Sequence, residues 1–136
     1  MRVAIGADDP CPLVDVLVSH LENEGHEVVT PRPVGDPWPD VGRSVGEAVA
    51  GGAADVGVVC CWTGTGVSMA ANKVLGARAA LCVDAETARG ARRWNDANVL
   101  ALSQRLTTPT VAEEILDAFL GAEADEEERS NFGRLT

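Results

Sequence analysis

The sequence is short of basic residues and of long apolar runs, and both shortages exclude classes of function. Its 136 residues include 11 lysines and arginines against 21 aspartates and glutamates, a net charge of −10. Nucleic-acid-binding proteins need a basic surface for the phosphates, so we expect no nucleic-acid partner. No apolar stretch approaches the ~18 residues that span a bilayer, and the N-terminal residues lack the apolar core of a signal peptide. We therefore expect a cytoplasmic protein that makes no membrane contact.

Metal-binding and nucleotide-binding motifs are also missing. The cysteines Cys11, Cys60, Cys61 and Cys82 show no Cys-x-x-Cys or paired Cys/His spacing, so we expect free thiols and no zinc. The glycine loop Thr63-Gly64-Thr65-Gly66 has neither the lysine of a P-loop nor the complete G-x-G-x-x-G spacing, which argues against a nucleoside triphosphate or a dinucleotide. We expect no metal and no cofactor.

Five short apolar runs alternate with five segments of helical pattern. The apolar runs are residues 2–7, 26–31, 55–62, 77–83 and 98–103. The helical segments are residues 13–25, 41–52, 66–74, 85–95 and 108–121. Continuous apolar strands that alternate with helices predict a three-layer, Rossmann-like α/β fold, with a five-stranded parallel sheet and helices on both faces. The proline-rich segment between residues 32 and 40 is predicted to be an irregular loop.

The length suits one domain with one core. We expect residues 1–122 to form the α/β domain and residues 123–136 to form an acidic C-terminal tail. Two interpretations of the tail stay open: a solvated, frayed end, or a segment that crosses to a partner subunit.

Cys61 is the most informative residue because it ends a predicted strand beside the glycine loop. Ligands bind at the carboxyl ends of the strands in such sheets, and the first amides of a helix lack internal partners and attract anions. A thiol at a helix N-terminus can act as a thiolate. Side-chain alternation sends Cys60 to the opposite face of the sheet. A glycine turn alone is more often structural, and we expect Cys11, Cys60 and Cys82 to be inert packing residues.

The segment CWTGTGVSMAANKVLGARAALCVDAETARGARRWNDANVLAL, residues 61–102, resembles the type B ribose-5-phosphate isomerases and the related galactose-6-phosphate isomerases. Their segment reads, roughly, C-G-T-G-x-G-x-S-x-A-A-N-K, then R-A-A-L-C-x-D, then H-N-D-A-N-V-L. IGADD and WPD in this chain resemble their I-G-S-D-H and Y-P-D. The match runs from residue 2 to about residue 120.

The resemblance implies an aldose–ketose isomerase that works through a cis-enediolate without a cofactor. Cys61 matches the cysteine that acts as base, and Thr63 matches the threonine that moves a proton between the two oxygens. The amides of residues 64–66, together with Ser68, match the oxyanion hole. Asp8 matches the aspartate that binds sugar hydroxyls. Carbon deprotonation beside a carbonyl needs a base at the carbon and donors at the developing oxyanion, which agrees with these roles.

Substrate binding is where the sequence departs from the resemblance. Asn95 matches an asparagine at the substrate, but Asp9 replaces a histidine that helps to hold the phosphate. Trp94 replaces the histidine that opens the sugar ring. The C-terminal arginines that reach the phosphate of a neighbouring subunit match only loosely, with Arg129 and Arg134 as candidates. These departures indicate an altered or non-phosphorylated substrate.

Two functions therefore stay open at this point: an isomerase acting on a pentose or hexose, or a non-catalytic or half-site subunit that binds sugar. The resemblance implies a homodimer or homotetramer with sites at the subunit interface. Among other residues, we expect His20 and His26 to have surface or packing roles. Trp38 is equally compatible with a lid and a plug, and Arg78 and Arg105 are weak candidates for anion binding.

Overall fold

The sheet and its helices follow each other in strict alternation along the chain. The structure, a computed structural model, describes residues 1–135. Its elements are β1 (Arg2–Ala7), α1 (Pro12–Asn23), β2 (Glu27–Val29), α2 (Trp38–Ala50), β3 (Val56–Cys61), α3 (Thr65–Asn72), β4 (Ala79–Leu81), α4 (Ala85–Asn95), β5 (Val99–Ser103), α5 (Pro109–Gly121), the 3-10 helix η1 (Glu126–Glu128) and α6 (Arg129–Phe132).

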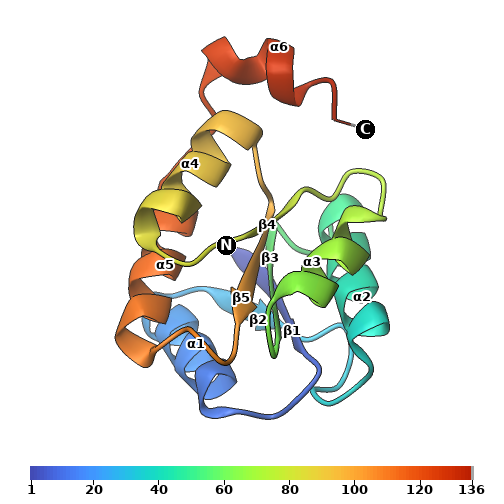
Figure 1. Ribbon diagram of the computed structural model, residues 1–136, viewed down its shortest axis with the longest axis vertical. Helices are drawn as coiled ribbons and strands as arrows, with labels where there is room; N and C mark the ends of the chain where they lie inside the picture. The colour runs from blue at the N-terminus through green and yellow to red at the C-terminus, as the bar shows by residue number, and fades with distance from the viewer. Residues whose placement is uncertain (136) are drawn as a thin grey trace.

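The five strands form one parallel sheet in the order β2-β1-β3-β5-β4. Helices α1, α4 and α5 cover one face, and α2 and α3 cover the other (Figure 1). The central strand β3 is buried along its whole length, because a parallel sheet with helices on both faces has no solvated side. The predicted fold class is confirmed.

Alternation along β3 sends the two adjacent cysteines into different cores. Cys60 packs with apolar residues of α1 and α5, whereas Cys61 packs with apolar residues of α2 and α3. The predicted separation of the two thiols is confirmed, and it places Cys61 on the side of the sheet from which the glycine loop leads into α3.

Helix α2 begins at Trp38, three residues earlier than predicted, so the prediction of an irregular loop is wrong for residues 38–40. Pro39 lies in the first turn, where a helical residue needs no N–H partner and a fixed φ is an advantage. Prolines at a helix start were therefore misinterpreted as part of the preceding loop.

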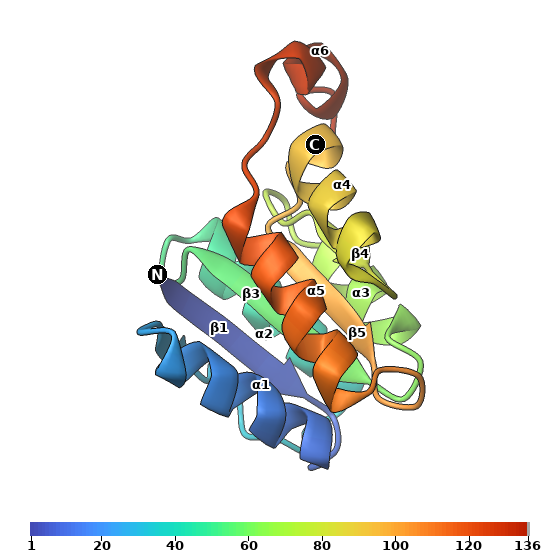
Figure 2. The same cartoon turned by 90° about the vertical axis from the view of Figure 1, so that its left-hand side faces the viewer.

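The C-terminal segment packs against the end of α4. Arg93 and Asp125 form an ion pair of 3.0 Å, Arg92 Nε donates to the carbonyl of Ala122 at 3.2 Å, and Phe132 is buried. Figure 2 shows α6 beyond the C-terminal end of α4, at one extremity of the molecule. A crossing of this tail to a partner subunit stays a prediction.

Candidate active site

Three loops meet at the carboxyl edge of the sheet and are tied together by hydrogen bonds. The backbone N–H of Gln104 donates to the carbonyl of Cys61 at 2.9 Å, and the N–H of Arg105 donates to the carbonyl of Trp62 at 3.1 Å. Ser103 Oγ donates to the same Trp62 carbonyl at 3.0 Å, and Gln104 Nε2 donates to the carbonyl of Asp9 at 3.3 Å. The loops after β1, β3 and β5 therefore form one connected surface.

Gly64 makes the sharp turn from β3 into α3. Its φ is +79°, in the left-handed region, and a Cβ placed there would lie 2.6 Å from Leu81 Cδ1 and 2.9 Å from the backbone of Leu102. Glycine is therefore required for both conformation and space. Gly64 is also the N-cap residue of α3 and offers no capping side chain, so the first amides of the helix stay available to an anionic ligand.

Two hydroxyl groups stand at this turn. Thr63 Oγ1 and Thr65 Oγ1 are 2.7 Å apart, and both residues are exposed. Gly66 and Ser68 follow in the first turn of α3 and are half-buried. Residues 63–68 thus combine hydroxyl groups with helix N-terminal amides, which are the donors that a developing oxyanion needs.

Cys61 differs from the other buried thiols in its neighbours. It is 5% exposed and immediately precedes the loop that carries these donors. Burial raises the pKa of the Cys60 thiol, and burial followed by the charge of Asp84 raises that of Cys82 to about 11. Cys60 and Cys82 therefore stay protonated packing residues, and Cys61 is the one buried thiol in residues 1–135 that directly precedes the glycine loop.

Asp8 carries the one buried side-chain oxygen that lacks a hydrogen-bond partner within residues 1–135, its Oδ1. Desolvation, and secondarily the charge of Asp9, raise the pKa of Asp8. In the sheet register Ala7 lies opposite Cys60, so Asp8 follows at the level of Cys61. An unpaired buried carboxylate oxygen is costly unless a ligand supplies a donor, and a sugar hydroxyl is such a donor.

The remaining predicted residues lie elsewhere. Asn95 and Arg134 line one cavity of about 540 Å³, together with Arg78, which is paired with Asp96 at 2.6 Å. Trp94 lines a second cavity, between β4 and α4, which Asn95 also borders. Arg129 is engaged in an ion pair with Glu126 at 2.7 Å. The structure thus brings Asn95 and Arg134 together but keeps both away from the glycine loop.

The two groups lie at opposite edges of the sheet. Helix α4 starts at the carboxyl end of β4 and runs back against the strand direction, so its last residue, Asn95, lies at the amino edge of the sheet. Figure 1 shows the C-terminal end of α4, together with helix α6, at the extremity of the molecule away from the strand carboxyl ends. Strands rise about 3.3 Å per residue, so a five-residue strand such as β5 separates the two edges by roughly 15 Å. One chain does not bring Asn95 to Cys61.

The structure makes Arg105 a stronger candidate for anion binding than the sequence indicates. Among residues 1–135, only three basic side chains make no hydrogen bond or ion pair with another of these residues: Lys73, Arg105 and Arg134. Arg105 is exposed in the loop after β5, whose backbone contacts Trp62. The one signal of this role in the sequence is its position just after a predicted strand. Its lack of a partner could not be predicted from sequence.

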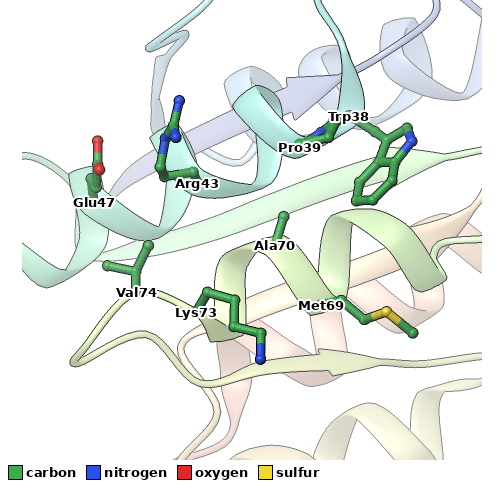
Figure 3. Close-up of a pocket in the computed structure, with 8 residues that line it drawn as sticks. All are labelled: Trp38, Pro39, Arg43, Glu47, Met69, Ala70, Lys73 and Val74. Atoms are coloured by element: carbon green, nitrogen blue, oxygen red, sulfur yellow. The ribbon is translucent and has the colours of Figure 1, made fainter.

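An apolar groove of about 460 Å³ runs between α2 and α3 beside this edge (Figure 3). Its walls include Trp38 from the start of α2 and Met69 and Lys73 from α3. The Trp38 indole covers Gly66, since a Cβ there would lie 2.9 Å from its Cε3 atom. Cys61 is not part of the lining of this groove.

Residues 1–135 contain neither a membrane-spanning helix nor a metal-binding cluster. No helix among them is long and apolar enough to cross a membrane. No three histidine, cysteine, aspartate or glutamate side chains gather there in a way that could hold a metal ion.

Comparisons with known proteins converge on one family. The profile of the family described as Ribose/Galactose Isomerase matches residues 3–134. A galactose-6-phosphate isomerase subunit, LacB, of Clostridium acetobutylicum is 42% identical over 126 residues, which are 90% of this chain and 73% of that protein. Ribose-5-phosphate isomerase B of Escherichia coli is 41% identical over 126 residues, 90% of this chain and 85% of that protein. The structure of Clostridium thermocellum ribose-5-phosphate isomerase B is 37% identical, with a TM-score of 0.92 over 98% of this chain and 94% of the other.

Proposed function

The chain belongs to the ribose/galactose isomerase family, a family of aldose–ketose isomerases, and from that premise we propose that it isomerises a pentose or hexose phosphate through a cis-enediolate, with Cys61 as base. Relatives of similar identity act on a ribose phosphate and a galactose phosphate by name, so family membership leaves the sugar open. Residues 1–122 form the isomerase domain in this proposal.

The proposed reaction moves one proton between neighbouring carbons. The Cys61 thiolate removes the proton from the carbon beside the carbonyl, and the electron pair moves onto the carbonyl oxygen. The Thr63 hydroxyl transfers a proton between the two substrate oxygens, and the Cys61 thiol returns its proton to the other carbon. The amides of residues 64–66 stabilise the enediolate, each donor by ~3 kcal/mol in the transition state.

Asp8 and Arg105 bind the substrate from the same chain as Cys61 in this proposal. The unpaired Oδ1 of Asp8 accepts a hydrogen bond from a sugar hydroxyl. Asp9 repels a phosphate by a few kcal/mol at close range and an effective dielectric constant of ~20, so the phosphate lies away from Asp9. The unpaired Arg105 side chain, in the loop after β5, supplies the charge that holds it.

The complete site requires two chains. Asn95 and Arg134 lie at the amino edge of the sheet and Cys61 at the carboxyl edge, so both groups meet only when a second copy is turned end for end. We therefore propose a homodimer in which Trp94 and Asn95 of α4, and Arg134 of the tail, serve the site of the other subunit. A symmetric pair of chains then carries two identical sites.

The observation that carries the proposal is the convergence at one edge of Cys61, the Thr63 hydroxyl, the uncapped start of α3 and the unpaired Asp8 oxygen. The test is solvent-deuterium incorporation at carbon 1 or 2 of D-ribose 5-phosphate and D-galactose 6-phosphate. Cys61→Ala abolishes incorporation, whereas the matched control Cys82→Ala, at another buried thiol, retains it. Unchanged incorporation in Cys61→Ala excludes the cysteine base.

A second candidate, a half-site subunit that needs a related partner chain, has its own support. Trp94 cannot exchange protons as the matched histidine does, and one relative is itself a subunit of a galactose-6-phosphate isomerase. The deuterium assay on the pure chain separates the two candidates. Incorporation into any of a broad panel of sugars and sugar phosphates excludes the second, and failure across the panel favours it.

A further inference from the structure

The aromatic residues of this chain are divided between the interior and the surface. Both phenylalanines are buried, but all three tryptophans are exposed: Trp62 by 65%, Trp94 by 50% and Trp38 by 45%. Full burial of a large apolar side chain stabilises a fold by about 2–3 kcal/mol. Because each of the three indoles stays about half exposed or more, the chain forgoes part of that gain, and exposed aromatic groups are typical of contact surfaces.

Trp62 is held at the reaction centre by its backbone. It lies between Cys61 and Thr63, and its carbonyl accepts hydrogen bonds from Ser103 Oγ and from the N–H of Arg105. These bonds fix the peptide to the loop after β5. The indole itself is the most exposed of the three, so core packing does not explain a residue of this size here.

Trp38 contacts the other end of the same segment. Its ring lies against Gly66 in the first turn of α3, and only a glycine leaves room for it, because an added Cβ would lie 2.9 Å and 3.0 Å from two ring atoms. Figure 3 shows the indole directed from the start of α2 toward α3. Residues 61–66, which carry the proposed base and oxyanion donors, thus contain one exposed tryptophan near their start and contact a second one near their end.

We propose that Trp62 is a specificity-determining residue that stacks on the C–H face of the substrate sugar, with Trp38 as a second aromatic wall. This inference rests on the proposed function, because it places the sugar against residues 61–66. The face of a sugar ring that carries C–H groups is apolar and packs on the electron-rich face of an indole, while the indole N–H can donate to a hydroxyl. The substrate class is a sugar phosphate.

Intrinsic fluorescence tests this contact directly. The chain has three tryptophans and no tyrosine, so the double variant Trp38→Phe/Trp94→Phe leaves Trp62 as the dominant emitter. Titration with D-ribose 5-phosphate and D-galactose 6-phosphate is expected to change its emission saturably for at least one of them. Inorganic phosphate, which lacks the C–H face, is expected to leave the emission unchanged.

Steady-state kinetics separate stacking from chemistry. For the sugar that the wild type isomerises, Trp62→Ala is expected to raise KM about tenfold and Trp62→Phe far less, with kcat within about twofold. Leu75→Ala removes another exposed apolar side chain, 76% exposed, and is the matched control with unchanged KM.

The two hypotheses fail in different ways. The stacking role alone is overturned if the wild type isomerises a sugar, the Trp62→Ala variant has the same KM as the wild type, and the Trp62 emission does not change with that sugar. Trp62 emission that changes only with protein concentration also overturns it, because a second chain then covers the indole. If the wild type turns over no sugar, the proposed isomerase function fails, whereas a saturable Trp62 response to sugar phosphate still supports stacking.

Discussion

Gly64 shows how much of the site depends on a single backbone position. A side chain there meets both an unfavourable φ and the Leu102 backbone. We expect Gly64→Ala to lower the free energy of unfolding by about 2–4 kcal/mol and to abolish isomerisation, measured by urea unfolding and the deuterium assay. Gly25→Ala is the control, since Gly25 has a similar φ of +85° but nothing within 4 Å, and its loss should be about 1–2 kcal/mol. Equal losses in both variants would contradict the packing argument.

Asp9 offers a test of where the phosphate lies. Because the phosphate is proposed to lie away from Asp9, Asp9→His and Asp9→Asn should lower KM for a sugar phosphate only slightly; a fall of about tenfold or more would place the phosphate at the loop after β1. The corresponding sugar without phosphate should keep its KM. A KM that rises in Asp9→Asn would instead assign the Asp9 carboxylate a direct role in holding the substrate.

Among single residues, the features that could be predicted from the sequence are those that depend on local backbone geometry. The opposite orientations of Cys60 and Cys61 follow from strand alternation, and the tight turn at Gly64 follows from a glycine between a strand and a helix. The Asp8 oxygen and the Arg105 side chain are unpaired because no segment distant in the sequence brings a hydrogen-bond partner to them. The sequence alone does not show which partners are missing.

Helices α1 and α5 are joined by a hydrogen bond to a titratable histidine side chain. His20 Nε2 lies 2.6 Å from Asp117 Oδ1, and this bond is the largest of the causes that raise the pKa of His20 above 6.5, with Glu113 and Glu24 adding to it. The folded protein therefore holds this proton more tightly than the unfolded chain. The resulting stabilisation is complete below pH 6.5 and is lost as the pH rises through the raised pKa.

The consequence can be measured by urea unfolding at pH 5.5 and pH 8.5. The wild type should lose stability from this pair between the two values, and His20→Gln should lose less because glutamine does not titrate. Asp117→Asn should behave like His20→Gln, since it removes the carboxylate partner. The same pH dependence in all three proteins would contradict the assignment.

The elements themselves were predicted well, and the one clear error has a physical origin. Apolar runs and their spacing indicate the strands and helices, but the prolines around Trp38 predict a loop where the structure begins α2. Proline disrupts the interior of a helix and is favoured in its first turn. A proline-rich stretch immediately before a helical pattern is therefore ambiguous.

In the whole molecule, the predicted site residues lie at two opposite edges of the sheet. The resemblance implies that Asn95 lies at the substrate, but α4 carries Asn95 back to the amino edge. The helix that connects two parallel strands must return in this way. The separation thus follows from the predicted topology, and it is the reason for the proposal of a second chain.

Subunit complementation tests this shared site most directly. Cys61→Ala and Asn95→Ala chains are prepared separately, mixed in equal amounts after unfolding, and refolded together; the deuterium assay is then run with the sugar phosphate that the wild type isomerises. Each variant alone should be inactive or nearly so. Half of the refolded dimers contain both chains and carry one intact site of two, so the mixture should recover about a quarter of the wild-type activity. A mixture no more active than its components would contradict a site built from Cys61 of one chain and Asn95 of the other.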